Sequence, residues 1–160
     1  MDYIAVDIGG TQLRAAVYPA EGIRPIRQKR IPTRGPGTPM ERLVGLIAEL
    51  WPTGDRVVAI SAGVPGMVDP ETGILYRAPN IPEWDGMLLR AELEVRFKVP
   101  VFVGNDANLA ALGEWLFGAG QGHHNLLYLT ISTGIGGGVI IQDRLLLGWR
   151  GLAGELGHVT

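Results

Sequence analysis

The chain has 160 residues, of which 46% are hydrophobic and 19% charged, and its formal net charge is −2. This composition predicts a packed globular core, excludes wholesale disorder and gives no electrostatic case for a nucleic-acid partner. Because the chain has no cysteine, it can form neither disulfide bonds nor thiolate metal sites. No apolar run approaches the ~20 residues of a membrane helix, and the start at Met1 has no signal-peptide pattern, so we expect no membrane partner and a cytoplasmic location.

The first predicted elements are two apolar strands, residues 3–7 and 12–18, joined by a glycine-rich turn. In the second strand every other residue is apolar, which indicates one buried face. A third strand over residues 24–32 is half polar and is expected near a sheet edge. The first two strands and their turn fit a hairpin.

A helix is predicted to begin where Thr38 supplies a cap and Pro39 the first helical residue, and to stop at Pro52. Its apolar residues Leu43, Leu46, Ile47 and Leu50 are expected to form one stripe. The next strand, residues 57–61, ends in a small, rigid loop over residues 62–66. The elements expected after it, in chain order, are an ordered loop over residues 68–83, a helix over 87–97 capped by Asp85, a strand over 99–103, and a helix over 106–117 with Leu109, Leu112 and Leu116 facing inward.

Strands alternating with helices after an opening hairpin indicate a mixed α/β sheet. The glycine-dense segment 118–122 is the best candidate for a domain boundary, because strands are predicted again over residues 126–132 and 139–141. We therefore expect one α/β domain over residues 1–118 and the start of a second α/β domain over residues 119–160. The second segment is too short for a core of its own and is expected to be incomplete.

Two glycine-rich loops lie at predicted strand ends. The first places Gly9, Gly10 and Thr11 directly after Asp7, and the second has the sequence TGIGGG at residues 133–138. Glycine lets backbone N–H groups approach a ligand closely, so two such loops predict a nucleotide triphosphate held from two sides. A lone glycine doublet is more often a bare turn, and neither loop has the spelling of a Walker A motif or of the dinucleotide fingerprint.

The lysines of the chain, Lys29 and Lys98, are both remote in sequence from these loops. The charge of a triphosphate would therefore be met by backbone N–H groups, threonine hydroxyls and a metal ion. Asp7 is the natural partner of Mg²⁺, which keeps several waters when it binds carboxylates. The expected nucleotide-binding residues are Asp7, Gly9, Gly10, Thr11, Thr133, Gly134, Gly136 and Gly137.

The sequence GNDAN at residues 104–108 places Asp106 where a predicted strand passes into a helix. Asp is a good helix N-cap, which is one interpretation of this position. Beside two phosphate-binding loops, a lone carboxylate also suits phosphoryl transfer to a hydroxyl. The helix N-terminus should depress the pKa of Asp106 and make it a weak base. Phosphoryl transfer has a loose transition state, so the carboxylate is needed mainly to orient the hydroxyl.

Glu155 and His158 lie three residues apart in a glycine-dense segment near the end of the chain. Such a pair can contact substrate hydroxyls, ligate a metal ion or arise by chance, and chance is ordinarily favoured. The dense glycines leave little room for a solvated helix face, which makes a shaped binding loop the better interpretation here.

Five motifs follow one another along the chain: DIGGT at residues 7–11, GVPG at 63–66, GNDAN at 104–108, TGIGGG at 133–138 and GLAGELGH at 151–158. In this order they resemble the ROK family of repressors and sugar kinases, and most closely its glucokinase-like kinases. The resemblance covers essentially the whole chain.

The resemblance implies an actin-like, ribonuclease-H-like ATPase fold of two α/β domains around a cleft, the first domain complete in this chain and the second truncated. It implies that Asp106 is the catalytic base for the primary hydroxyl of a sugar, and that the two glycine loops hold Mg²⁺ and ATP. His158 would also ligate a structural zinc in the full-length protein, together with three later cysteines that this chain lacks. The sugar-binding residues implied are Asn80, Asn105, Asp106, Glu155 and His158.

The predicted function is ATP-dependent phosphorylation of a hexose, glucose first, by an enzyme of which this chain is an N-terminal part. The fragment alone is expected to be inactive, and the full-length protein is expected to be a homodimer whose partners are a sugar and ATP. An N-acetylmannosamine or N-acetylglucosamine kinase and a non-catalytic, sugar-sensing regulator stay open as alternatives. Regulators of the family carry an N-terminal DNA-binding module, whereas here Met1 leads directly into the first strand.

Overall fold

The computed structural model describes residues 1–54, 57–131 and 134–158. The larger part of these residues is built on a mixed sheet with the strand order β3-β2-β1-β4-β8. β1, β2 and β3 are antiparallel neighbours, whereas β1, β4 and β8 are parallel. The predicted hairpin and the edge position of the third strand are confirmed. The strands are β1 (Asp2–Ile8), β2 (Gln12–Pro19), β3 (Arg27–Pro32), β4 (Val57–Val64) and β8 (Val101–Asn105).

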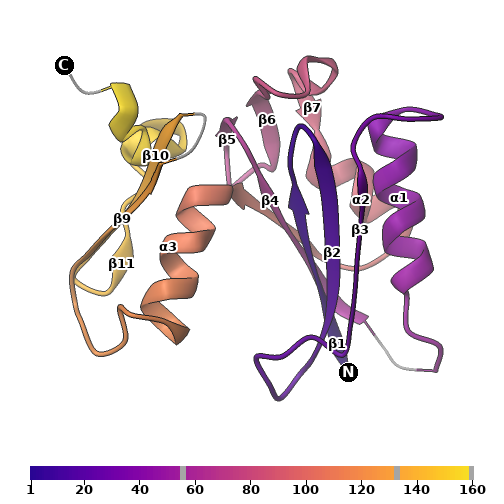
Figure 1. Cartoon of the computed structure of the whole chain (residues 1–160), viewed down its shortest axis with the longest axis horizontal. Coiled ribbons are helices and arrows are strands. Elements are labelled where there is room, and N and C mark those ends of the chain that lie inside the picture. Colours follow the sequence, from indigo (N-terminus) through magenta and orange to yellow (C-terminus); the bar gives the residue numbers. More distant parts are fainter. Residues whose placement is uncertain (55–56, 132–133, 159–160) are drawn as a thin grey trace.

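Two helices, α1 (Pro39–Leu50) and α2 (Leu89–Phe97), cover one face of this sheet (Figure 1). α1 begins with a capping box, in which Thr38 Oγ1 accepts a hydrogen bond from the Glu41 N–H and the Glu41 carboxylate accepts one from the Thr38 N–H. Within the described ranges, no helix combines the length and the apolar character needed to span a membrane. The predicted stripe of α1 is confirmed as part of the core: Leu43, Leu46, Ile47 and Leu50 are all buried.

The segment predicted as an ordered loop contains short strands instead. β5 (Met67–Val68), β6 (Ile74–Arg77) and β7 (Met87–Leu88) form a small antiparallel sheet, and Pro82–Trp84 forms a turn of 3-10 helix, η1. Strands of two to four residues are too short to show a hydrophobic period, which explains the wrong prediction.

Asp85 is not a helix cap. α2 begins two residues later than predicted, after Leu88, whose side chain makes no capping hydrogen bond. Asp85 Oδ1 instead accepts a hydrogen bond from the Ala78 N–H over 2.7 Å. This contact closes the loop that carries Asn80, so the carboxylate shapes a loop rather than starting a helix.

A second sheet has the strand order β11-β10-β9 and consists of β9 (Leu126–Ile131), β10 (Ile135–Ile141) and β11 (Arg144–Leu145). The helix α3 (Asp106–Phe117) lies between this sheet and the main sheet in Figure 1, and it contacts β9 and β10 more extensively than β4 or β8. The buried residues of α3 are Ala107, Asn108 and Ala111. The predicted inward leucines are wrong in part: Leu109 and Leu112 are half-buried, and Leu116 is exposed.

Glycines of β10 explain why small residues of α3 face the second sheet. A Cβ on Gly138 would lie 2.6 Å from the Ala111 Cβ and 3.0 Å from the Ala107 carbonyl oxygen. The helix and the strand can approach this closely only because neither side presents a large side chain. β10 begins at Ile135, four residues earlier than predicted. Glycine weakens a strand and gives no sequence signal for one, so this part of β10 was not predicted as a strand.

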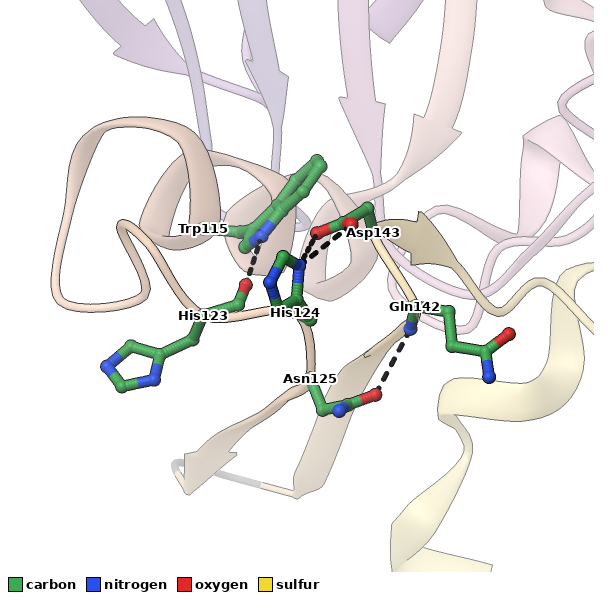
Figure 2. Close-up of polar contacts among 6 residues, drawn as sticks. All are labelled: Trp115, His123, His124, Asn125, Gln142 and Asp143. Atoms are coloured by element: carbon green, nitrogen blue, oxygen red, sulfur yellow. Dashed lines mark hydrogen bonds and ion pairs between the residues drawn. The ribbon is translucent and has the colours of Figure 1, made fainter.

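The residues directly after the predicted domain boundary are tied to their surroundings (Figure 2). Trp115 Nε1–H, near the end of α3, donates a hydrogen bond to the His123 carbonyl over 2.7 Å. His124 Nδ1 lies 2.9 Å from each carboxylate oxygen of Asp143, in the turn between β10 and β11. These contacts join α3 to the second sheet. The domain boundary at residue 118 stays a prediction.

We predict that Gly138→Ala destabilises the fold by about 1–3 kcal/mol, because the added methyl group must push α3 away from β10. Gly113→Ala is the matched control, since a Cβ at this α3 position would have no neighbour within 4 Å. There the same change should stabilise the helix by roughly 0.5–1 kcal/mol. Urea denaturation followed by circular dichroism measures both shifts; shifts of the same sign in the two variants would contradict the packing described.

Candidate functional site

The carboxyl ends of β1, β4 and β8 lie side by side because these strands are parallel neighbours. The register pairs Asp7 with Gly63 across β1 and β4, and Val64 with Asn105 across β4 and β8. Ligands of open α/β sheets bind where the chain leaves the carboxyl ends of the strands. Three of the motifs found in the sequence therefore meet at one edge of the sheet.

A hollow of about 420 Å³ opens at this edge. It brings together the residues predicted to contact a sugar with the backbone of the second glycine-rich segment. The described residues that line this hollow were thus predicted for two functions, sugar binding and nucleotide binding. The predicted site residues in this lining are Asn80, Asn105, Asp106, Gly134, Gly136, Gly137 and Glu155.

A larger groove of about 1020 Å³ lies between α3 and the face of the main sheet that α1 and α2 leave uncovered. Asp7 and Arg14 line it from the sheet, and Asp106 and Thr130 line both this groove and the smaller hollow. Asp106 therefore lies at the junction of the two spaces. Such an arrangement can hold an acceptor in the smaller hollow and a phosphoryl donor in the groove, with a carboxylate between them.

Asn105, not Asp106, is the N-cap of α3. The Asn105 Oδ1 accepts a hydrogen bond from the Asn108 N–H over 3.1 Å, and its Nδ2 donates to the Gly66 carbonyl oxygen over 3.1 Å. Asp106 is the first helical residue, and its Oδ1 accepts a hydrogen bond from the Ala107 N–H. The interpretation of Asp106 as a structural cap is therefore wrong, and its carboxylate faces the site instead.

Partial burial of the carboxyl raises the pKa of Asp106 above its ordinary value of 3.8, and the like charges of Asp7 and Glu155 raise it further. The hydrogen bond from the Ala107 N–H acts in the opposite direction. The expected depression of this pKa is wrong, because loss of hydration within the site outweighs the stabilisation of the charge at the helix N-terminus. A raised pKa makes Asp106 a better proton acceptor when ionised.

The first glycine loop is the turn between β1 and β2, as predicted. The Gly9 N–H donates to the Gln12 carbonyl oxygen over 2.9 Å, and the Thr33 hydroxyl donates to the Gly9 carbonyl oxygen. A Cβ on Gly10 would lie only 2.3 Å from the Asn80 Cβ, so this loop is packed directly against the loop of Asn80, which is predicted to bind a sugar. The residues Gly9, Gly10 and Thr11 lie beside the two hollows rather than among the described residues that line them.

Asp7 occupies a position that fits Mg²⁺. Its side chain is 56% exposed at the groove, and its charge reaches Asp106 strongly enough to raise the pKa of that carboxyl. Among the described side chains, no group of three or more His, Cys, Asp or Glu could hold a metal ion. Mg²⁺ needs no such group, because it keeps several waters and binds through one or two carboxylates and the phosphates of a substrate.

The second glycine-rich segment is a loop only in part. Gly136 and Gly137 are strand residues of β10, paired with Thr130 and Leu129 of β9, whereas Gly134 precedes the strand. Their backbone nevertheless lines the smaller hollow. Thr133 lies outside the described residues, and its predicted contact with phosphate stays a prediction.

Glu155 follows a 3-10 segment, η2 (Trp149–Gly154), and lines the smaller hollow, half-buried. A Cβ on Gly154 would lie 2.3 Å from the Gly137 carbonyl oxygen, so this segment is seated directly on β10. His158 ends a second short segment, η3 (Leu156–His158), and its side chain lies outside the described part of the structure. Its predicted roles toward a sugar and a zinc ion stay predictions.

Arg14 and Thr130 also line the groove, although no sequence motif pointed to them. The hairpin register places Arg14 directly opposite Asp7, so a pairing count from the glycine turn could have found it. For Thr130 there was no local signal, because its position depends on how the second sheet packs against α3.

The sequence of residues 3–160 matches the family model of the ROK family. The glucokinase of Streptomyces coelicolor is 43% identical over 159 residues, a match that covers 98% of this chain and 49% of the glucokinase. The chain thus spans about half the length of this relative. The crystal structure of a ROK family glucokinase from Streptomyces griseus in complex with glucose and AMPPNP has a TM-score of 0.83 and 39% identity, covering 99% of this chain and 50% of that one.

A ROK family transcriptional regulator, a homologue of the E. coli MLC protein, has a TM-score of 0.89 at 30% identity, covering 99% of this chain and 41% of the regulator. A kinase and a regulator therefore share the architecture described above, which is the actin-like ATPase fold predicted from the sequence motifs. Because the family match extends over residues 3–160, the chain belongs to the ROK family.

Proposed function

We propose that this chain carries the phosphate-binding and sugar-binding portion of an ATP-dependent hexose kinase that converts glucose to glucose 6-phosphate. One observation supports this proposal above the others: Asp106 lines both the smaller hollow and the larger groove. A kinase needs a carboxylate between an acceptor hydroxyl and a phosphoryl donor, whereas a sugar sensor needs only the sugar-binding hollow.

In the proposed reaction, the sugar lies in the smaller hollow with its hydroxyls against Asn80 and Glu155. Asp106 orients the primary hydroxyl and accepts its proton. The hydroxyl oxygen forms a bond to the γ-phosphorus as the bond between this phosphorus and the β–γ bridging oxygen breaks, and ADP leaves. The loose transition state of phosphoryl transfer places most of the catalytic demand on positioning and on charge stabilisation.

Asp7 would hold Mg²⁺ through water, and the ion, when bound, neutralises phosphate charge. The first glycine loop lies on the same edge of the sheet, and its backbone N–H groups other than that of Gly9, which donates to the Gln12 carbonyl oxygen, would contribute further positive potential. The carboxylate of Asp106 stays available for the hydroxyl because Asn105, not Asp106, caps α3.

A 2-acetamido hexose is the second candidate acceptor. A further hollow of about 290 Å³ shares Gly66, Pro79 and Glu155 with the sugar-binding hollow, and its other lining residues are Met67, Arg77 and Leu152. Its largely apolar wall suits the methyl group of an N-acetyl substituent. Parallel assays with glucose, N-acetylglucosamine and N-acetylmannosamine distinguish the two acceptor classes.

We predict that Asp106→Asn in the complete gene product lowers the rate of glucose phosphorylation by about 10²–10⁴-fold, because the amide cannot accept the hydroxyl proton. The measurement is a coupled assay with Mg²⁺, ATP and glucose, beside a binding assay in which the affinity for glucose should change by less than about threefold. Glu49→Gln, which removes an exposed carboxylate of α1 paired with Lys29, is the control and should retain full activity. An Asp106→Asn variant with an undiminished rate would remove Asp106 from the mechanism.

The same substitution should also stabilise the folded chain at neutral pH. Because the folded state holds the pKa of Asp106 above 3.8, it favours the protonated carboxyl, and this stability is lost as the pH rises through the raised value. Asparagine mimics the neutral form, so the urea midpoint of Asp106→Asn should exceed that of the unsubstituted chain at pH 7, and the two midpoints should converge below pH 3.8. Equal midpoints at both pH values would contradict the raised pKa.

Gly10→Ala should raise the KM for the sugar in the complete gene product by about tenfold or more, because the methyl group would occupy the space of the Asn80 side chain and displace its loop. Gly45→Ala in α1 is the control, since a Cβ there has no neighbour within 4 Å. Steady-state kinetics with varied sugar measures the effect. An unchanged KM for the sugar would show that Asn80 does not contact it.

A further inference from the structure

We propose that Arg14 binds the phosphoryl group during its transfer and stays in contact with the phosphate of the product, a sugar 6-phosphate. This inference rests on the proposed kinase function and assigns a residue that none of the sequence motifs had singled out.

The groove must accept a strongly anionic substrate, yet Asp7 and Asp106 both present carboxylates to it. Among the described residues that line this groove, Arg14 is the one cationic side chain. Arg30 lies opposite Arg14 on β3 and lines a neighbouring hollow on the sheet face, but it is not part of the groove lining. Arg14 is therefore the described side chain best placed to offset the charge of a phosphoryl group beside Asp106.

The neighbours of Arg14 direct its guanidinium toward the groove. Arg14 lies between Asp7 and Arg30 in the sheet, directly opposite each of them. Like charges directly opposite one another repel, so the pairing with Arg30 is unfavourable and the side of Asp7 is preferred. Arg14 Nη1 indeed lies 3.7 Å from Asp7 Oδ2.

The ion pair with Asp7 leaves the guanidinium available to a ligand. A separation of 3.7 Å is too long for a hydrogen bond, and the side chains of Arg14 and Asp7 are 59% and 56% exposed. An exposed pair of this kind is weak, because solvent screens the attraction between the two charges. A phosphoryl group carries more negative charge than a carboxylate and can accept two parallel N–H hydrogen bonds from the guanidinium, whereas the contact with Asp7 is too long for one.

The role in the reaction follows from the same geometry. Charge spreads over the three equatorial oxygens of the phosphoryl group as it passes between donor and acceptor, and a fixed cation nearby stabilises that charge. Arg14 forms no covalent bond and moves no proton. It would hold the group beside Asp106 and release it together with the sugar phosphate.

The test compares Arg14→Gln with Arg30→Gln in the complete gene product, since both variants remove one positive charge from the same face of the sheet. Arg14→Gln should lower kcat for glucose phosphorylation by about 10²–10³-fold, whereas Arg30→Gln should change it by less than about threefold. Arg14→Lys, which keeps the charge but lacks the planar fork, should recover part of the rate and shows that the position tolerates substitution.

A binding measurement separates phosphate contact from a structural effect. In an Asp106→Asn background, Arg14→Gln should weaken the binding of glucose 6-phosphate at least tenfold and leave glucose binding unchanged, as measured by isothermal titration calorimetry. Equal effects on both ligands, or equal effects of Arg14→Gln and Arg30→Gln, would overturn the inference. A change confined to the Mg²⁺ dependence of the rate would overturn it as well, because Arg14 would then act only by orienting Asp7.

Pyrophosphate binding distinguishes failure of this inference from failure of the proposed function. If the unsubstituted protein phosphorylates no sugar but binds pyrophosphate in an Arg14-dependent manner, the kinase proposal falls and the anion-binding role of Arg14 stands. If it phosphorylates glucose and Arg14→Gln matches Arg30→Gln, the kinase proposal stands and the role of Arg14 falls. Absence of both activities overturns both.

Discussion

The site depends on the parallel pairing of β1, β4 and β8. Parallel neighbours must leave the sheet at the same edge, so residues far apart in sequence, such as Asp7, Val64 and Asn105, are brought together by backbone hydrogen bonds alone. α1 and α2 pack on the opposite face and bury it in the hydrophobic core. The positions of the functional side chains therefore follow from the same interactions that form the core. Residues that directly follow these strands are positioned by the strands themselves.

The second constraint is the close approach of α3 and β10. Gly138 of β10 meets Ala107 and Ala111 of α3, so the helix packs on the second sheet while its first residue, Asp106, follows directly from a strand of the main sheet. Asp106 is thus held by both parts of the structure at once. The amide of Asn105 adds to this, because it caps α3 and also binds the Gly66 carbonyl oxygen in the loop after β4. A carboxylate placed in this way contacts two spaces without belonging to a mobile loop.

Much of this arrangement could be predicted from the sequence, and the failures have physical causes. The alternation in β2, the stripe of α1 and the cap at Thr38 are strong local signals, and each is confirmed. The strands β5 to β7 are too short to have a period, and the glycines of β10 disguise a strand as a loop. The pKa of Asp106 was predicted in the wrong direction because the helix N-terminus is visible in sequence, whereas burial and the charges of Asp7 and Glu155 depend on tertiary structure. Arg14 was missed because charge balance in a groove is a property of several elements together.

The contact between Gly10 and Asn80 has a consequence for binding thermodynamics. A ligand that immobilises the turn after β1 also restricts the loop on which Asn80 lies. A second ligand that binds at the loop of Asn80 then loses less conformational entropy, because this loop is already partly ordered. Two ligands that share an ordering cost in this way bind with positive heterotropic cooperativity, and the coupling free energy is the same whichever of them binds first. A substitution that opens a gap between the two loops would therefore leave each binary affinity nearly intact while abolishing synergy in the ternary complex.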